Sequence, residues 1–190
     1  IMLERNQKDY LDYYLFLMDT GLRKTEALKL KKSDVQTDVV SKTQYVIVQE
    51  SKNNEKRSVP LCKRASEIVS RLIEHKEEDD CIFQLNTWTV QHKWTDLREL
   101  MGLEDDREFT LHALRHTYAS RLAQSGKVDF HKIGVLMGHK SLQMTKRYSH
   151  LMPQHTFSVV DVLDNDRSND ESEKSSDASE KLIDIKSHKG

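Results

Sequence analysis

Two short runs rich in β-branched residues, QYVIVQE (44–50) and RSVPL (57–61), lie on either side of the polar segment SKNNEKR. Extended runs around a polar turn with two adjacent asparagines predict an antiparallel β-hairpin. Most other patterned segments of the chain have the spacing of helices. The sequence therefore predicts a mostly α fold with one small antiparallel β-sheet, in the α+β class.

Helical spacing is clearest near the start of the chain. The segment QKDYLDYYLFLMD (7–19) has apolar side chains at positions 11, 14, 15 and 18, the period of an amphipathic helix. Gly21 interrupts this pattern, and RKTEALKLKKSDV (23–35) then predicts a short second helix. Further helices are expected over 63–76 and 88–101, and 81–85 fits either a short strand or an extended connector.

Three more helices are expected after residue 109. Thr110 can cap a helix that runs to about Gln124, where serine and glycine provide a stop. The segment DFHKIGVLMG (129–138) predicts a short helix that ends at its glycine. SLQMTKRYSHL (141–151) predicts another, with Ser141 as its cap and a proline beyond its end.

Charge divides the chain into two parts. Nine acidic and five basic residues give 161–190 a net charge of −4, whereas the 25 basic and 22 acidic residues of 1–160 leave +3. The last segment is poor in apolar residues and rich in Ser, Asp and Glu, so we expect a disordered acidic tail. We expect one folded domain over 1–160, whose charge permits DNA binding without indicating it.

Several classes of protein are not supported by the sequence. No apolar run approaches the roughly 18 residues of a membrane span, and the first residues do not resemble a signal peptide. Cys62 and Cys81 lack the spacing of a redox or zinc motif, so we expect reduced thiols in a cytoplasmic protein.

The segment LHALRHTYASRL (111–122) allows two kinds of site. His112 and His116 are four residues apart, a spacing that can bind a metal ion, but position 113 is alanine rather than the glutamate of HExxH. His112 and Arg115 are three apart and can bind an anion from one helix face. A surface helix whose arginine pairs with a nearby acid is the plain alternative.

Four other segments add groups of the same chemistry. TGLRKTEAL places Arg23 and Glu26 three residues apart, and the polar turn of the hairpin holds Lys52. Lys56 and Arg57 lie on the same predicted turn and are alternatives to Lys52. LMGHKS places His139 at what we expect to be a helix start, where free N–H groups favour an anion. TKRYSHL places Tyr148 nine residues later.

These five segments, in this order over residues 20 to about 152, resemble the catalytic domain of the tyrosine recombinases, the phage integrase family. The resemblance implies that family's catalytic-domain fold and site-specific DNA recombination. A tyrosine attacks the scissile phosphodiester, forms a 3′-phosphotyrosyl intermediate, and the strands are exchanged and rejoined without metal, other cofactor or ATP. The implied catalytic residues are Arg23, Lys52, His112, Arg115, His139 and Tyr148.

The resemblance also implies a role for each residue. Arg23 and Arg115 would clamp the phosphate, and Tyr148 would be the nucleophile. His112 is our candidate for the base that takes the tyrosine proton, His139 would donate a hydrogen bond, and Lys52 would protonate the leaving 5′ oxygen. Glu26 would orient its neighbours and His116 would be structural. The family often has aspartate at position 113, where this chain has alanine.

Partners follow from the same resemblance. It implies binding to double-stranded DNA, a homo-tetramer on DNA, a monomer when free, no membrane association, and a cytoplasmic location in a bacterial cell or phage-infected host. The N-terminal core-binding domain common in the family is expected to be absent from this chain. Two alternatives stay open: a non-catalytic DNA-binding protein of the same fold, and DNA relaxation of the type IB topoisomerase kind.

Overall fold

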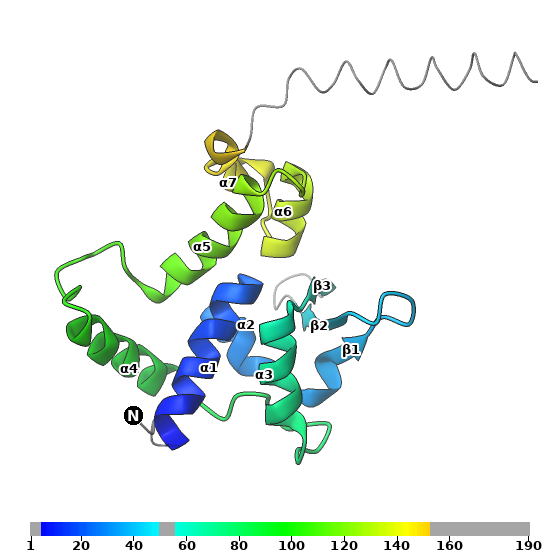
Figure 1. Cartoon of the computed structure of the whole chain (residues 1–190), viewed down its shortest axis with the longest axis vertical. Helices are drawn as coiled ribbons and strands as arrows, with labels where there is room; N and C mark the ends of the chain where they lie inside the picture. The colour runs from blue at the N-terminus through cyan, green and yellow to red at the C-terminus, as the bar shows by residue number, and fades with distance from the viewer. Residues whose placement is uncertain (1–4, 50–55, 153–190) are drawn as a thin grey trace, which may run out of the picture. The chain divides into compact units, whose positions relative to one another are not determined.

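A computed structural model describes residues 5–49 and 56–152, which belong to one structural unit. Lys52 and the predicted acidic tail lie outside the described residues. Figure 1 shows helices arranged around a small sheet, and the predicted α+β class is confirmed. None of the helices in the described ranges has the length and apolar character that a membrane span requires.

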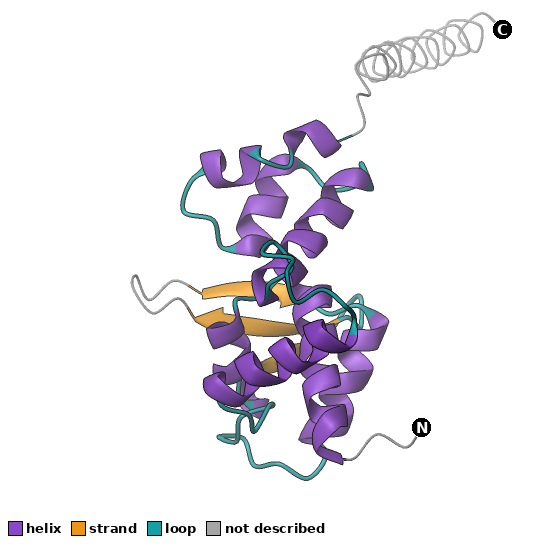
Figure 2. Cartoon of the chain, turned by 90° about the vertical axis from the view of Figure 1, so that its left-hand side faces the viewer, coloured by secondary structure: helices purple, strands orange, loops and turns teal. Residues whose placement is uncertain are grey.

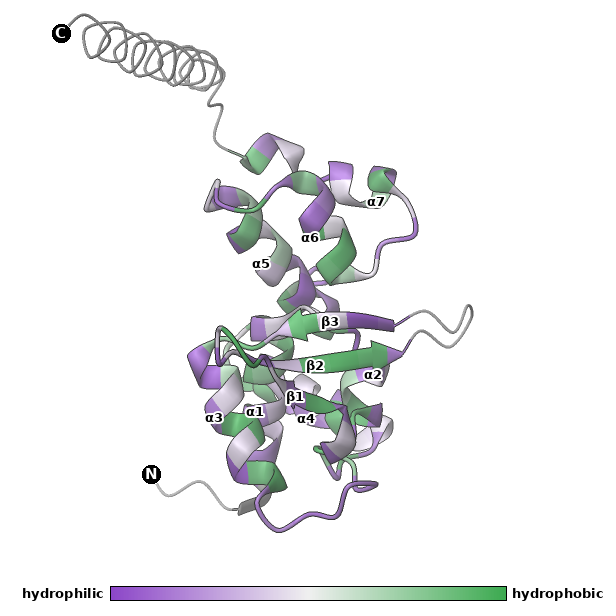
Figure 3. Ribbon diagram, turned by 90° about the vertical axis from the view of Figure 1, so that its right-hand side faces the viewer, coloured by the Kyte–Doolittle hydropathy of each residue, from purple (hydrophilic) through white to green (hydrophobic). Residues whose placement is uncertain are grey.

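The sheet has three antiparallel strands in the order β1–β2–β3. They are β1 (Val35–Thr37), β2 (Gln44–Gln49) and β3 (Lys56–Pro60). The predicted hairpin is confirmed by the β2–β3 pairing, in which Val46 lies opposite Val59 and both are fully buried. Figure 2 shows the strands side by side, and the hydropathy colours of Figure 3 show that part of β2 is hydrophobic.

The predicted helix over 23–35 is too long. The observed helix α2 (Lys24–Lys29) ends at Leu30, whose backbone is extended and whose side chain is buried. A 3-10 turn, η1 (Lys32–Asp34), follows, in which the Asp34 carboxylate accepts a hydrogen bond from the N–H of Lys31. Val35 then begins the edge strand that pairs with β2, because the hydrogen bond from Lys31 to Asp34 turns the chain away from the axis of α2.

The other N-terminal elements agree with the predictions to within a few residues. They are α1 (Arg5–Thr20), α3 (Lys63–Ile73) and α4 (Thr87–Leu100). The segment 81–85 is neither a strand nor extended throughout: it is an irregular connector with bends at 82 and 83, and an isolated bridge joins Cys81 to Lys31. Aromatic and aliphatic side chains of these elements form the larger core, including Tyr13, Phe16 and Trp94.

The C-terminal part consists of α5 (Leu111–Gln124), α6 (Phe130–Met137), α7 (Leu142–Lys146) and the 3-10 turn η2 (Ser149–Leu151). The single helix predicted over 141–151 is therefore two short helical pieces that meet at Tyr148. Thr110 and Ser141 occupy the predicted cap positions, but neither side chain makes a capping hydrogen bond. Asp129 does cap α6, by accepting from the N–H of Lys132 at 2.8 Å.

Tyr148 belongs to a second, smaller hydrophobic core between α5 and α6. Its fully buried members are Ala119, Ala123 and Ile133, with Met137 and Tyr148 almost as buried. Helix α5 packs against α1, and α6 packs against β3, which Figure 3 shows as the strand nearest to α6. These contacts bring the turn after α1, strand β3 and the ends of α6 and α7 together around α5.

Candidate active site

The turn between α1 and α2 is shaped for close packing against α5. Gly21 has φ of +64°, and a Cβ atom there would lie 2.3 Å from Cδ1 of Tyr118. Only glycine fits this position, because both the left-handed backbone and the tyrosine ring oppose a side chain. Two residues later, Arg23 precedes α2, so the turn places this arginine directly beside α5.

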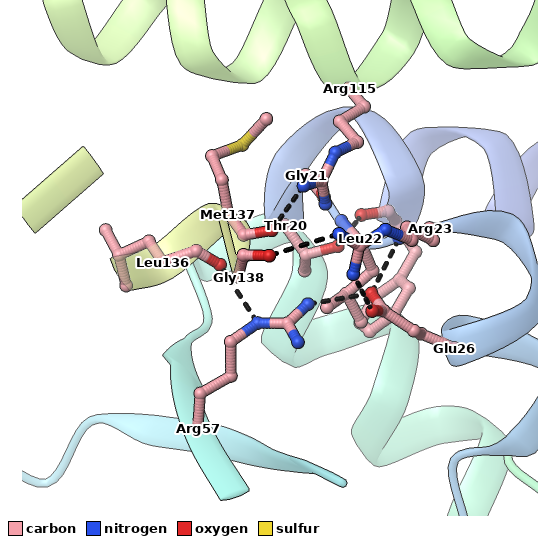
Figure 4. Close-up of polar contacts among 11 residues, drawn as sticks. Thr20, Gly21, Leu22, Arg23, Glu26, Arg57, Arg115, Leu136, Met137 and Gly138 are labelled. Carbon is pink, nitrogen blue, oxygen red and sulfur yellow. Dashed lines mark hydrogen bonds and ion pairs between the residues drawn. The ribbon is translucent and has the colours of Figure 1, made fainter. Parts of the chain in front are cut away.

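Arg115 connects three segments from the middle of α5. Its guanidinium donates to the carbonyl oxygen of Gly21 at 2.5 Å and to that of Met137, and the residue is only 4% exposed. Figure 4 shows it reaching into the gap between the glycine turn and the end of α6. Burial, and then the charge of Arg23, lower the pKa of Arg115 to about 10, so it remains a cation at neutral pH.

Glu26 lies between two guanidinium groups. Its Oε1 atom is 2.6 Å from Arg23, and its Oε2 atom is 2.7 Å from Arg57. Oε2 also accepts from the N–H of Arg23 at 2.8 Å and so caps α2. Burial acts to raise the pKa of the Glu26 carboxyl, but the bonds from Arg57 and Arg23 outweigh it, and the pKa is lowered. Glu26 therefore joins two guanidinium groups, while its role in orienting them for catalysis stays a prediction.

Arg57, which the sequence offers only as an alternative to Lys52, is connected to the site in the structure through Glu26. It is buried on β3, pairs with Glu26, and donates from Nε to the carbonyl oxygen of Leu136 at 3.2 Å (Figure 4). The alternation of β3 contains the signal that could have found it. Exposed and buried residues alternate along the strand, and Arg57 lies on the same face as the buried Val59. A charged residue on that face requires a buried partner.

His139 is not at a helix start, contrary to the prediction. It directly follows the left-handed Gly138 that ends α6, and its N–H donates to the carbonyl oxygen of Gly134 at 2.9 Å. Nδ1 of His139 lies 2.7 Å from Oγ1 of the fully buried Thr145, so a side chain of α7 orients the ring. Burial, followed by the charges of Arg115 and Arg23, lowers the pKa of His139 to about 4.

Tyr148 places its hydroxyl against a histidine of α5. The hydroxyl oxygen is 2.5 Å from Nδ1 of His116, while His112 packs edge to face on His116 with ring centroids 4.6 Å apart. His116 was expected to be structural and His112 to be the partner of the tyrosine. In the structure the Tyr148 hydroxyl contacts His116, and the role expected of His112 stays a prediction. Burial raises the pKa of Tyr148, against the opposing charges of Arg147 and Arg115.

A pocket of about 420 Å³ collects most of these side chains. The described residues that line it include three arginines and three histidines and no carboxylate, which suits an anion. Five of the six predicted catalytic residues lie on its wall; Lys52 lies outside the described residues. Its lining consists of Arg23, His112, Arg115, His116, His139, Ser141, Gln143, Met144, Arg147 and Tyr148.

A metal ion is a poor match for the histidine pair. Nδ1 of His116 faces the Tyr148 hydroxyl, and the rings of His112 and His116 meet at 89°. Across residues 5–49 and 56–152, no group of three or more His, Cys, Asp or Glu side chains is placed to hold a metal ion.

The pocket is cationic and has a tyrosine hydroxyl on its wall. Such a site belongs to the class of proteins that can place a phenol next to a phosphate-like anion. The sequence model of the phage integrase family matches residues 4–155, and the chain belongs to that family.

Named relatives agree with the family assignment. The tyrosine recombinase XerA of Saccharolobus solfataricus is 29% identical over 136 residues, which cover 72% of this chain and 44% of that protein. The integrase of Salmonella phage P22 is 26% identical, over 74% of this chain and 38% of that protein. The chain spans about half the length or less of the first relatives it matches.

Solved structures share the fold. The catalytic domain of bacteriophage HP1 integrase aligns with a TM-score of 0.62 and 21% identity, over 85% of this chain and 93% of that one. The XerH site-specific recombinase bound to its difH substrate aligns with a TM-score of 0.63 and 20% identity, over 78% of this chain and 45% of that one. The predicted catalytic-domain fold is therefore confirmed.

Proposed function

We propose that this chain cleaves and rejoins double-stranded DNA at specific sites, with Tyr148 as the nucleophile. The observation that carries the proposal is the position of the Tyr148 hydroxyl on the wall of the cationic pocket, beside Arg23 and Arg115. Membership of the phage integrase family supports it, as does the XerH structure, which is a complex with a DNA substrate.

The pocket suits the electrostatics of phosphoryl transfer. A phosphodiester is an anion, so it repels an incoming nucleophile and gains further charge on its oxygens in the transition state. Arg115 is held in place by two carbonyl groups and Arg23 by Glu26 and the carbonyl of Gly138, so the two cations are positioned before DNA arrives. His139, neutral because its pKa is about 4, can donate a hydrogen bond to the phosphate from its second nitrogen.

The reaction is proposed to run in two balanced steps. The Tyr148 oxygen bonds to phosphorus, the bond from phosphorus to the 5′ oxygen breaks, and a 3′-phosphotyrosyl link forms. Lys52 is proposed to give the leaving oxygen its proton. Attack by a 5′ hydroxyl, from the same or an exchanged strand, then releases the tyrosine, and the phosphodiester energy is retained, so no ATP is consumed. The chain is proposed to act as a homo-tetramer on double-stranded DNA, with the six predicted catalytic residues in each copy.

Covalent trapping tests the proposal. The chain is mixed with a pool of nicked duplexes that have a randomised central region, so that a cleaved strand is lost and the adduct accumulates. We expect an SDS-resistant adduct that forms in the presence of EDTA and disappears in Tyr148→Phe, while DNA binding remains. Sequencing of the attached strands then gives the site.

The other outcomes would contradict the proposal in distinct ways. DNA binding without an adduct would indicate a non-catalytic DNA-binding protein. An adduct accompanied by relaxation of supercoils, with no exchange between two duplexes, would indicate the topoisomerase type of activity. An adduct that persists in Tyr148→Phe would exclude Tyr148 as the nucleophile.

A further inference from the structure

We propose that His116, and not His112, is the general base that takes the phenolic proton from Tyr148. This inference rests on the proposed function, since it concerns the step in which Tyr148 attacks. The hydrogen bond of 2.5 Å between Nδ1 of His116 and the Tyr148 hydroxyl carries it. A base must lie within hydrogen-bond reach of the proton that it removes, and this contact meets that condition before any substrate is bound.

The three histidines of the pocket differ in what each one contacts. His139 has its Nδ1 atom on Thr145, and it lies on the segment after α6. The ring of His112 packs edge to face on the ring of His116, with an angle of 89° between the two ring planes. His116 contacts the tyrosine oxygen itself. Helix α5 thus contributes to the pocket both Arg115 and the adjacent His116, which contacts the nucleophile.

The surroundings keep His116 in the form that can accept a proton. Burial lowers its pKa, and the charges of His112, Arg147 and Arg115 lower it further, against a small opposing effect of Glu108. At neutral pH the imidazole is therefore neutral, and Nδ1 can accept from the hydroxyl while Nε2 holds the ring proton. A bound phosphate would offset the charges of Arg115 and Arg147 and so favour the imidazolium formed during attack.

The proton balance of the step is simple. The O–H bond of Tyr148 breaks and its proton moves to Nδ1 of His116 as the oxygen bonds to phosphorus. The 5′ oxygen leaves with the proton assigned above to Lys52. In the rejoining step the attacking 5′ hydroxyl returns its proton to Lys52, and the tyrosine oxygen leaves phosphorus and takes its own proton back from His116.

The first test uses no DNA. Tyrosine labelled with ¹³C at Cζ and histidine labelled with ¹⁵N are followed by NMR over a pH titration. We expect the Tyr148 signal to shift at the same pH at which His116 gains its second proton, because Nδ1 then stops accepting. This pH-dependent shift of the Tyr148 signal should be absent in His116→Gln and present in His112→Gln. A Tyr148 signal that follows His112, or follows neither histidine, would overturn the assignment.

The second test measures adduct formation over pH with the duplexes selected by the trapping experiment. In the parent chain the rate should rise with pH and level off once His116 is neutral. In His116→Gln, whose amide keeps a hydrogen bond to the tyrosine, the rate at pH 7 should fall by at least ~100-fold and the levelling should be lost. His131→Gln, an exposed position on α6, is the matched control and should change neither.

The results separate the two proposals. No adduct from the parent chain would contradict the proposed function and, with it, the role of His116. An adduct from the parent chain combined with a His116→Gln rate within threefold and an unchanged pH profile would overturn the role of His116 alone. If His116→Gln does not fold, as judged by its melting temperature, the NMR titration of the parent chain still decides.

Discussion

The guanidinium of Arg57 lies 2.7 Å from the carboxylate of Glu26, and the same carboxylate is 2.6 Å from Arg23. One acidic side chain therefore connects strand β3 with an arginine of the phosphate pocket. Arg57 also reaches α6 through the carbonyl of Leu136. These contacts relate the position of β3 to that of the pocket.

Replacing Glu26 by glutamine should destabilise the chain. The change removes a carboxylate that pairs with two guanidinium groups, one of them buried, and breaking a buried ion pair costs about 3 kcal/mol or more. Urea unfolding at pH 7 measures the free energy of unfolding. Asp96→Asn removes an exposed pair with Lys93 and should cost less than about 1 kcal/mol. Equal effects of the two changes would contradict the prediction.

The contribution of Glu26 should also depend on pH. The folded-state pKa of its carboxyl lies below the unfolded value of about 4.3, so its stabilisation is fully present above that value. It is lost as the pH falls through the folded-state pKa. The stability difference between the parent chain and Glu26→Gln should therefore shrink in acid, as measured by urea unfolding from pH 7 to pH 3. A difference that grows in acid would show that the sign is wrong.

Alanine at Gly21 should be far more damaging than alanine at Gly102. Both glycines have a left-handed backbone, with φ of +64° and +65°, which costs an alanine about 1 kcal/mol. At Gly21 the new Cβ would also strike Tyr118, which adds about 1–3 kcal/mol, whereas nothing lies within 4 Å at Gly102. Thermal unfolding of both variants measures the difference. Similar melting temperatures would show that the turn can move away from α5.

Thr145→Val should weaken catalysis while it preserves the shape of α7. The change removes the hydroxyl that orients His139, and one such hydrogen bond is worth about 1 kcal/mol, or roughly fivefold in rate. The rate of adduct formation and the ¹⁵N signals of His139 report the effect. Thr145→Ser keeps the hydroxyl and should restore both. A Thr145→Val chain with parental rate and unchanged His139 signals would show that the contact has no role.

DNA binding by this chain should be weak and should fall steeply as salt rises, because its affinity depends on contacts between cations and phosphates. Lys29 and Lys31 lie on the same surface, but Lys31 is paired with Asp79 at 2.8 Å. Fluorescence anisotropy over a range of salt concentrations should show a slope reduced by about 1 in Lys29→Ala and by less in Lys31→Ala. Tight binding that is independent of salt would contradict this expectation.

Local sequence patterns determined much of this protein. Apolar spacing and end signals predicted α1, α3, α4, α5 and α6, because these features act within a few turns of the chain. The ordered motifs predicted the family and five of the ten side chains that line the pocket. Local signals did not predict the third strand, since Val35 joins β2 only after a cap that turns the chain.

Tertiary structure alone decided which side chains act on one another. The burial of Arg57 and its pairing with Glu26 depend on two segments that are 31 residues apart. The preference of the Tyr148 hydroxyl for His116 over His112 depends on how the start of η2 meets α5, across 32 residues. Sequence motifs identify the groups of such a site. Their hydrogen bonds are set by packing between distant elements, which no local pattern contains.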